Sequence, residues 1–298
     1  MTITAEAVKQ LRERTGAGMM ECKKALVEAG GDLDAAAELM RKQGLAKADK
    51  KATRLAAEGT IVAARSADGR TAALAEINCE TDFVAREQDF RAFAATVGEL
   101  ALANRTLEVA TLLALKTSSG DTLEERRRAL IAKIGENITV RRVAVVSAPT
   151  TVGAYIHHSN RVGTLIALKG GDEALARDVA MHVAAINPEF VSPGDVPADL
   201  IAKEREIFAE QVKAEGKPPE IAAKMLEGKL RKRLNEMSLL GQPFVKDDKM
   251  TVEGLLKKAG ATVTSMVRFE VGAGLEKKQG DFAAEVMATV QGAAAARH

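Results

Sequence analysis

The side chains that most often carry out chemistry in proteins are few in this sequence and lie far apart. The histidines are His157, His158, His182 and His298, and the cysteines are Cys22 and Cys79. No cysteine approaches a histidine at a spacing typical of a zinc site. The sequence also lacks the glycine-rich loops that hold nucleotide phosphates and the G-x-S-x-G turn of serine hydrolases. These observations argue against a zinc site, the usual nucleotide-binding enzymes and a serine hydrolase.

Two residues could still support an enzymatic function. Cys79 could act as a nucleophile with a histidine as its base, but it ends an apolar predicted strand, where a small buried thiol is the usual outcome. His182 lies in VAMHVAAINP, on a mostly apolar predicted helix, where a half-buried histidine with one hydrogen bond is the usual outcome. The sequence therefore favours structural roles for both residues.

The segment INCETDFVARE, residues 77–87, places an acid beside an aromatic residue, Asp82 and Phe83, between a predicted strand and a predicted helix. Aromatic residues make up only 3% of the chain, so a phenylalanine in a polar corner needs an explanation. An exposed Phe83 would gain about 1.5–3 kcal/mol when a partner buried its ring. Alternatively, Phe83 packs under the following helix while Asp82 caps that helix. Composition alone favours the second arrangement.

Charge and hydropathy limit the kinds of partner. The 298 residues include 43 basic and 41 acidic ones, and the net charge of +2 creates no strong field towards a polyanion. The start of the chain, MTITAEAVKQ, has no signal-peptide pattern, and no apolar run reaches the roughly 20 residues that a membrane span needs. We therefore expect a soluble cytoplasmic protein, with no membrane partner and no direct nucleic-acid partner.

Periodicity divides the chain into helical and α+β parts. Residues 4–44 show helical patterns joined by the turns TGAG and AGG, which predict a compact three-helix bundle. Residues 45–55 are basic, and they predict a partly helical linker. Next come a strand, the turn Asp68-Gly69, a second strand and a helix at about 89–104. The same order returns at 152–187, so we expect a duplicated α+β core of antiparallel sheets covered by helices.

The last third of the chain begins with helical periodicity. Two narrow apolar stripes between Pro197 and Leu239, separated by EGKPPE, predict an antiparallel helical hairpin, or coiled coil, that protrudes from the body. A strand is expected at 261–274 and a short helix at about 282–290. The expected domains are 1–54 (bundle and linker), 55–140 (first core subdomain), 141–275 (second core subdomain, with the hairpin inserted at about 195–238) and 276–298 (C-terminal module).

Five segments together closely resemble bacterial elongation factor Ts. They are LRERTGAGMMECKKAL (11–26), INCETDFVARE (77–87), KIGENITVRR (133–142), AMHVAAINPEFV (180–191) and GQPFVKDDKMTVEGLL (241–256). They follow the order of that family over nearly the whole chain. The resemblance implies a guanine nucleotide exchange factor in translation elongation. Such a factor binds GDP-bound elongation factor Tu and promotes GDP release so that GTP can bind. It implies no catalytic residue, no cofactor and no metal.

The same resemblance implies a role for the Thr-Asp-Phe-Val element. In that family the element enters the GTPase domain of elongation factor Tu beside the nucleotide and helps to dislodge the magnesium ion. The matching residues here are Thr81, Asp82, Phe83 and Val84. The resemblance thus implies the exposed arrangement of Phe83.

Other contacts with elongation factor Tu are also implied. Arg12, Met19 and Met20 match residues that touch the GTPase domain, although the two methionines alone fit a core and an interface equally well. His158 is the candidate for contact with the third domain, and the neighbouring histidine is the alternative. The turn reads HHSNRVG where HGARIG is the family's form. The bundle resembles a ubiquitin-associated (UBA-like) fold, which does not imply ubiquitin binding.

An RNA- or ribosome-binding protein is the alternative from another class. The basic stretch KADKKATR and the three arginines at 126–128 would form its binding surface. The near-neutral net charge and the scarcity of aromatic rings for base stacking argue against it.

Overall fold

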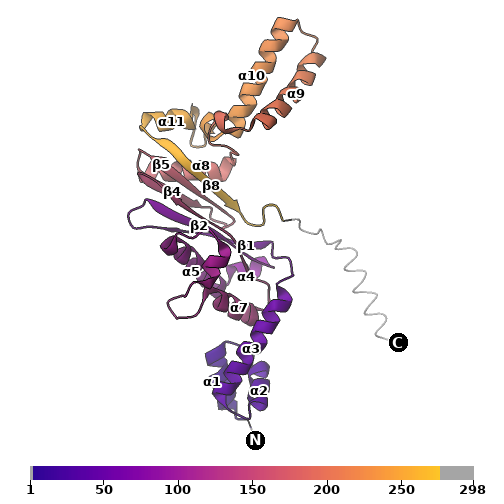
Figure 1. The fold of residues 1–298 in the computed structure, drawn as a ribbon, viewed down its shortest axis with the longest axis vertical. Helices are drawn as coiled ribbons and strands as arrows, with labels where there is room; N and C mark the ends of the chain where they lie inside the picture. The colour runs from indigo at the N-terminus through magenta and orange to yellow at the C-terminus, as the bar shows by residue number, and fades with distance from the viewer. Residues whose placement is uncertain (1–2, 276–298) are drawn as a thin grey trace, which may run out of the picture.

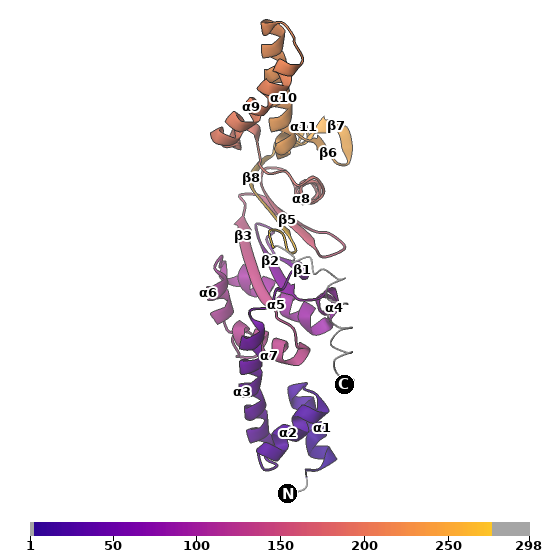
Figure 2. The same ribbon diagram turned by 90° about the vertical axis from the view of Figure 1, so that its right-hand side faces the viewer.

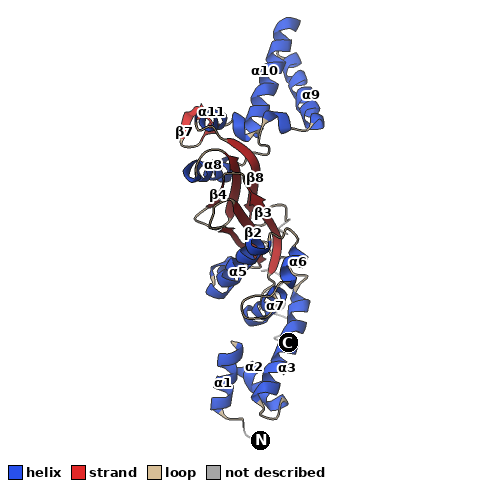
Figure 3. Cartoon of the chain, turned by 60° about the vertical axis from the view of Figure 1, so that its left-hand side comes forward, coloured by secondary structure: helices blue, strands red, loops and turns tan. Residues whose placement is uncertain are grey.

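The computed structural model describes residues 3–275, with the side chains of residues 45–49 excepted. The chain forms an elongated α+β structure (Figure 1), with a helical bundle at one end, strands in the middle and a pair of helices at the other end. Figure 3 shows the strands gathered between these two helical ends. The predicted fold class is confirmed. The predicted C-terminal module, with its helix at about 282–290, lies outside the described residues.

The N-terminal bundle consists of α1 (Ala5–Thr15), α2 (Met19–Glu28) and α3 (Leu33–Lys51). The Thr4 hydroxyl accepts a hydrogen bond from the Ala7 N–H and so caps α1. The bundle encloses a small core of Val8, Leu11, Cys22, Ala25, Leu26 and Ala36. Helix α3 runs on to Lys51, so most of the predicted linker is a continuation of the third helix.

The first sheet has the antiparallel order β1-β2-β3, formed by β1 (Glu58–Arg65), β2 (Thr71–Cys79) and β3 (Thr139–Ser147). The predicted turn at Asp68-Gly69 joins β1 to β2, and Gly69 adopts the positive φ of 68° that such turns require. Helix α5 (Gln88–Asn104) covers the sheet, as the sequence predicted. Two further helices, α6 (Val109–Ala114) and α7 (Leu123–Ile134), lead back to β3.

The second sheet repeats the plan of the first. Its antiparallel order is β4-β5-β8, formed by β4 (Thr151–Ile156), β5 (Val162–Lys169) and β8 (Thr262–Glu270). Helix α8 (Glu173–Ile186) follows the β4–β5 hairpin and packs on the sheet. The predicted duplication is therefore present.

The two sheets pack against each other between their helices. Because side chains alternate along a strand, Ala73 and Ala75 of β2 face α5, while Ala72 and Leu74 face the second sheet. The shared cluster between the sheets also contains Leu165 of β5. The core is thus built in the layers α5, first sheet, second sheet and α8.

A pair of antiparallel helices, α9 (Ala198–Ala214) and α10 (Pro219–Met237), protrudes from this body as predicted (Figure 2). It is held by the buried Val212 and Leu230 and by surface ion pairs such as Arg205–Glu227. The short elements that follow had no clear signal in the sequence. They are β6 (Pro243–Phe244), β7 (Asp247–Thr251) and α11 (Val252–Lys258).

His182 on α8 is completely buried, and both of its ring nitrogens have partners. The backbone N–H of Val245 donates to Nδ1 at 3.2 Å, so the neutral ring carries its proton on Nε2, which donates to Gln242 Oε1 at 2.9 Å. Burial lowers the pKa of His182, and the hydrogen bond with Gln242 offsets this only in part. His182 thus has the structural role expected from the sequence, but the ring is fully rather than half buried and has two hydrogen-bond partners rather than one.

The lowered pKa of His182 predicts that the free energy of unfolding decreases as the pH is lowered. Below the ordinary imidazole value of 6.5 the unfolded ring binds a proton, while the folded ring stays neutral until its own lower pKa is reached. The stability contribution is therefore complete above the unfolded pKa and is lost as the pH falls towards the folded pKa. Urea unfolding of the wild type and of His182→Gln, between about pH 7.5 and 5.5, measures this: the stability advantage of the wild type should shrink as the pH falls. A constant advantage would contradict the prediction.

Candidate functional site

The Thr-Asp-Phe-Val element forms the first turn of a short helix, α4 (Asp82–Arg86), directly after β2. Thr81 is the N-cap of this helix, and its hydroxyl accepts a hydrogen bond from the Val84 N–H at 3.4 Å. The alternative in which Asp82 caps the following helix is wrong, because Thr81 is the N-cap of α4 and Glu87 is the N-cap residue of α5. Asp82 instead pairs with Arg86, one turn further along, at 2.6 Å.

Phe83 projects into solvent, and 76% of its surface is exposed. Its neighbour Val84 is buried and packs in the cluster that contains Cys79 and Phe90. Since successive residues of a helix point in different directions, anchoring Val84 in the core turns Phe83 outwards. The alternative in which Phe83 packs under the following helix is therefore also wrong.

The acid beside the ring is only weakly engaged in the free protein. The Asp82 side chain is 47% exposed, and its ion pair with Arg86 is of the exposed helical kind that contributes about 0.3–0.5 kcal/mol. The carboxylate can therefore exchange Arg86 for another partner at little cost.

The thiol of Cys79 is held in an unreactive form below this helix. It is buried and donates a hydrogen bond to the Thr81 carbonyl oxygen at 3.1 Å. Burial, with the nearby carboxylates of Glu136 and Glu58 adding to it, raises the pKa of Cys79 to about 12. Because the thiolate is the nucleophilic form, this geometry contradicts the alternative of a cysteine enzyme.

The other predicted contact residues lie apart from α4 and are also on the surface. Met19 and Met20, at the start of α2, are 60% and 76% exposed, which removes them from the core of the bundle. Arg12 is exposed on the neighbouring helix α1. The structure thus brings these three residues into one small bundle.

The histidine pair lies in the turn between β4 and β5. The rings of His157 and His158 are 4.0 Å apart between centroids, and Nδ1 of His157 is 2.8 Å from the Ser159 hydroxyl. His158 is exposed, whereas His157 is partly covered. Of the two, His158 offers more surface to a partner.

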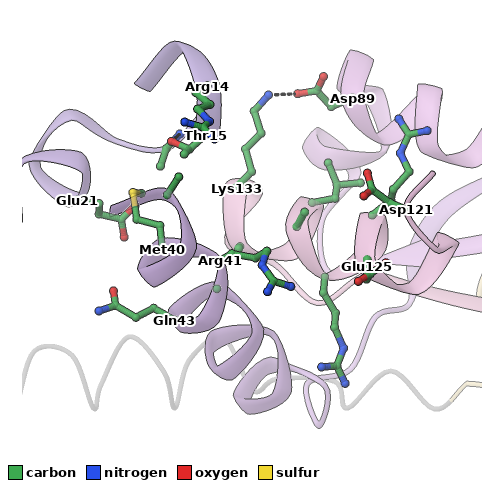
Figure 4. Close-up of a pocket in the computed structure, with 18 of the residues that line it drawn as sticks. Arg14, Thr15, Glu21, Met40, Arg41, Gln43, Asp89, Asp121, Glu125 and Lys133 are labelled. Atoms are coloured by element: carbon green, nitrogen blue, oxygen red, sulfur yellow. Dashed lines mark hydrogen bonds and ion pairs between the residues drawn. The ribbon is translucent and has the colours of Figure 1, made fainter. Parts of the chain in front are cut away.

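An open cavity of about 960 Å³, which no sequence pattern predicted, separates the bundle from α5 and α7. In Figure 4, Arg14 and Met40 border it from the bundle, while Asp89 and Lys133 border it from the core and pair with each other at 2.6 Å. Charges of both signs line this space, so its electrostatics select no particular ligand. The bundle meets the core mainly where α3 packs on α7.

Within residues 3–275 no group of three or more histidine, cysteine, aspartate or glutamate side chains is placed to hold a metal ion. In the same part of the chain no helix has the length and apolar character needed to cross a membrane.

Of the residues predicted for the site, Arg12, Met19, Met20, Phe83 and His158 are exposed on the surface. The model of the family described as elongation factor TS matches residues 80–273, which include the whole of α4. The chain is 58% identical over 293 residues to elongation factor Ts of Alkalilimnicola ehrlichii, covering 98% of this chain and 100% of the relative. It is 59% identical over 290 residues to that of Francisella tularensis subsp. novicida, covering 97% and 99%. The chain belongs to the elongation factor Ts family.

Members of this family are the nucleotide exchange factors of elongation factor Tu in translation elongation. The chain is accordingly an exchange factor and not an enzyme that makes or breaks bonds, which confirms the function expected from the sequence. Bacterial factors of this family work in the cytoplasm. Family membership therefore favours the exchange factor over the RNA-binding alternative.

The exposure of Phe83 predicts that its ring contributes little to folding. Replacing Phe83 by alanine should change the free energy of unfolding by no more than about 0.5 kcal/mol, as for other surface positions. Phe90→Ala is the matched control, because that ring is completely buried in the adjoining core; we expect it to cost about 3–5 kcal/mol. Urea unfolding followed by circular dichroism measures both. A comparable loss in the two variants would show that Phe83 is packed in the free protein.

Proposed function

We propose that the chain promotes GDP release from elongation factor Tu by inserting α4, with Phe83 foremost, beside the nucleotide site of the GTPase. The supporting observation is the 76% exposure of Phe83 on a helix whose opposite side is fixed by the buried Val84. Burying the ring in a partner would contribute about 1.5–3 kcal/mol. Because the helix is anchored beforehand, little of this gain is spent on ordering the chain.

The residues around Phe83 have different roles in the insertion. Thr81 and Val84 hold α4, while Asp82 brings a carboxylate next to the ring. Magnesium in GTPases bridges phosphate and protein oxygens and keeps several ordered waters. A ring that displaces the neighbouring backbone, together with a carboxylate that competes for its hydrogen bonds, weakens that shell. GDP then loses its counter-ion.

Such a mechanism couples two binding sites. The inserted helix lowers the affinity for GDP by the same factor by which bound GDP lowers the affinity for the exchange factor. For linked sites this coupling is typically about 1–3 kcal/mol. Exchange is therefore accelerated in both directions, and the equilibrium between GDP and GTP is unchanged.

Contacts outside α4 would supply affinity and orientation. We assign Arg12, Met19 and Met20 to the GTPase domain and His158 to the third domain of elongation factor Tu. The exposure of both methionines supports this, since methionine adapts to varied surfaces and arginine is common among the strongest interface residues.

We propose the division into a bundle, two core subdomains and a C-terminal module that the sequence predicts. Separate hydrophobic clusters in the bundle, below the first sheet and below the second sheet support the first three parts. The expected boundary at 140 falls inside β3, which pairs with β2, so we place the end of the first core subdomain after Ser147. The helix pair is an insertion at about 195–238 in the second core subdomain. The remaining module, 276–298, falls outside the described residues.

The test is the release of a fluorescent GDP analogue from elongation factor Tu with magnesium present. We expect the wild type to accelerate release, and Phe83→Ala to lower the maximal rate by about tenfold or more, the rate equivalent of the lost burial. Asp82→Ala should lower it too, while both variants still bind. Val245→Ala, which trims another exposed side chain near β6, is the control and should match the wild type.

Two results would contradict the proposal at different levels. Wild-type protein that leaves GDP release unchanged would remove the exchange activity altogether. Full activity in both α4 variants would leave the activity standing but remove the inserted helix as its cause.

A further inference from the structure

Glu136, in the turn between α7 and β3, is bonded to the start of α4. Its Oε2 accepts the backbone N–H groups of Glu80 at 3.1 Å and Thr81 at 3.0 Å, and its Oε1 accepts the Thr81 hydroxyl at 2.7 Å. Hydrogen bonds to a carboxylate are stronger than those between neutral groups. One side chain thus fixes both the backbone and the hydroxyl of the residue that caps α4.

The hydrogen bond to Glu136 also fixes which way the Thr81 hydroxyl points. A threonine hydroxyl has one proton to donate and two lone pairs to accept with. Since the proton of Thr81 is committed to Glu136, the lone pairs of its oxygen remain for the Val84 N–H. Glu136 therefore acts on α4 through Thr81.

The neighbouring residues make the connection reciprocal. The Glu80 carboxylate accepts the Asn137 N–H at 2.6 Å, so each turn supplies one carboxylate to the backbone of the other. The Asn137 side chain in turn donates to the Arg54 carbonyl at 2.7 Å, in the segment that leaves α3. We call the set Glu80, Thr81, Glu136 and Asn137 the turn clamp.

Helix α4 needs such support because it is only five residues long. A helix of this length is not stable alone, so its direction depends on what its ends and its buried side are attached to. Val84 anchors the buried side, and the turn clamp anchors the N-terminal end. Without the clamp, α4 would still be attached to the core but free to tilt around Val84.

We propose that Glu136 is a positioning residue for nucleotide exchange, which holds Phe83 in its inserting direction by way of Thr81. This inference rests on the function proposed above. It predicts that losing Glu136 weakens the step in which GDP is expelled more than it weakens the association with elongation factor Tu.

The experiment measures release of the fluorescent GDP analogue over a range of exchange-factor concentrations, which separates the maximal rate from the half-saturating concentration. Glu136→Ala should lower the maximal rate by about tenfold and change the half-saturating concentration by less than about twofold. Glu136→Gln should recover most of the rate, because its amide oxygen can still accept both backbone N–H groups.

Glu124→Ala is the matched control. This carboxylate lies on α7, close in sequence to Glu136, but it is bonded to Arg127 and Arg128 rather than to the start of α4. Its loss should leave the maximal rate of exchange unchanged. An equal loss of rate in Glu124→Ala would mean that any damage to α7 has the same effect, which overturns the inference.

The decisive comparison repeats Glu136→Ala in a Phe83→Ala background. If Glu136 acts by aiming the ring, its loss should add less than about twofold once the ring is gone. Multiplication of the two losses would overturn the inference, because it would show an effect independent of Phe83. Should Glu136→Ala not fold, the same comparison is made with Thr81→Val, which removes the hydroxyl that Glu136 holds.

The outcomes separate this inference from the proposed function. A slow Phe83→Ala variant together with a fully active Glu136→Ala variant overturns the positioning role alone. An inactive wild type, or a fully active Phe83→Ala variant, overturns the proposed mechanism and the positioning role with it.

Discussion

The buried carboxylate of Glu76 joins the two sheets on which the other elements are mounted. It lies on the face of β2 towards the second sheet and accepts hydrogen bonds from Arg141, Arg142 and the Gly272 N–H at 2.6–2.9 Å. Successive residues of a strand normally point to opposite faces, but the β2–β3 pairing is bulged beside Glu76, so both arginines reach it. Burial alone would raise the pKa of Glu76; the Gly272 N–H, Arg141, Asn78 and Arg142 outweigh it and hold the pKa below its usual value. Any other register between β2 and β3 would leave this buried charge without its partners, which is strongly destabilising.

That register determines where the functional helix begins. Along β2, Glu76 faces the second sheet and Ile77 faces α5, so a slip by one residue would move the carboxylate into the apolar layer. The strand ends at Cys79, and α4 starts within three residues of it. The exposed ring of Phe83 is therefore placed by the packing of the core, although it takes no part in that core.

Much of this architecture can be read from the sequence, because it depends on local patterns. Alternation along the strands, the Asp68-Gly69 turn and the charged faces of α9 and α10 each carry their own signal. The exposure of Phe83 has no such signal, because Thr81 and Asp82 are both residue types that cap helices, and the packing of Val84 decides which way the helix faces. Glu136 was missed for a related reason: its partner Thr81 lies 55 residues away in the chain, and no local pattern links two such distant polar side chains.

The helix pair α9 and α10 leaves the body and returns to it at one place. The backbone of Phe190 accepts the Leu239 N–H at 2.8 Å, and that of Met237 accepts the Glu189 N–H at 2.9 Å, so the two ends of the insertion are fastened to each other. Within the described residues, these backbone hydrogen bonds form a closed neck between the pair and the body. The appendage is thus modular: evolution can lengthen, shorten or replace it without disturbing the strand order on which the exchange surface depends.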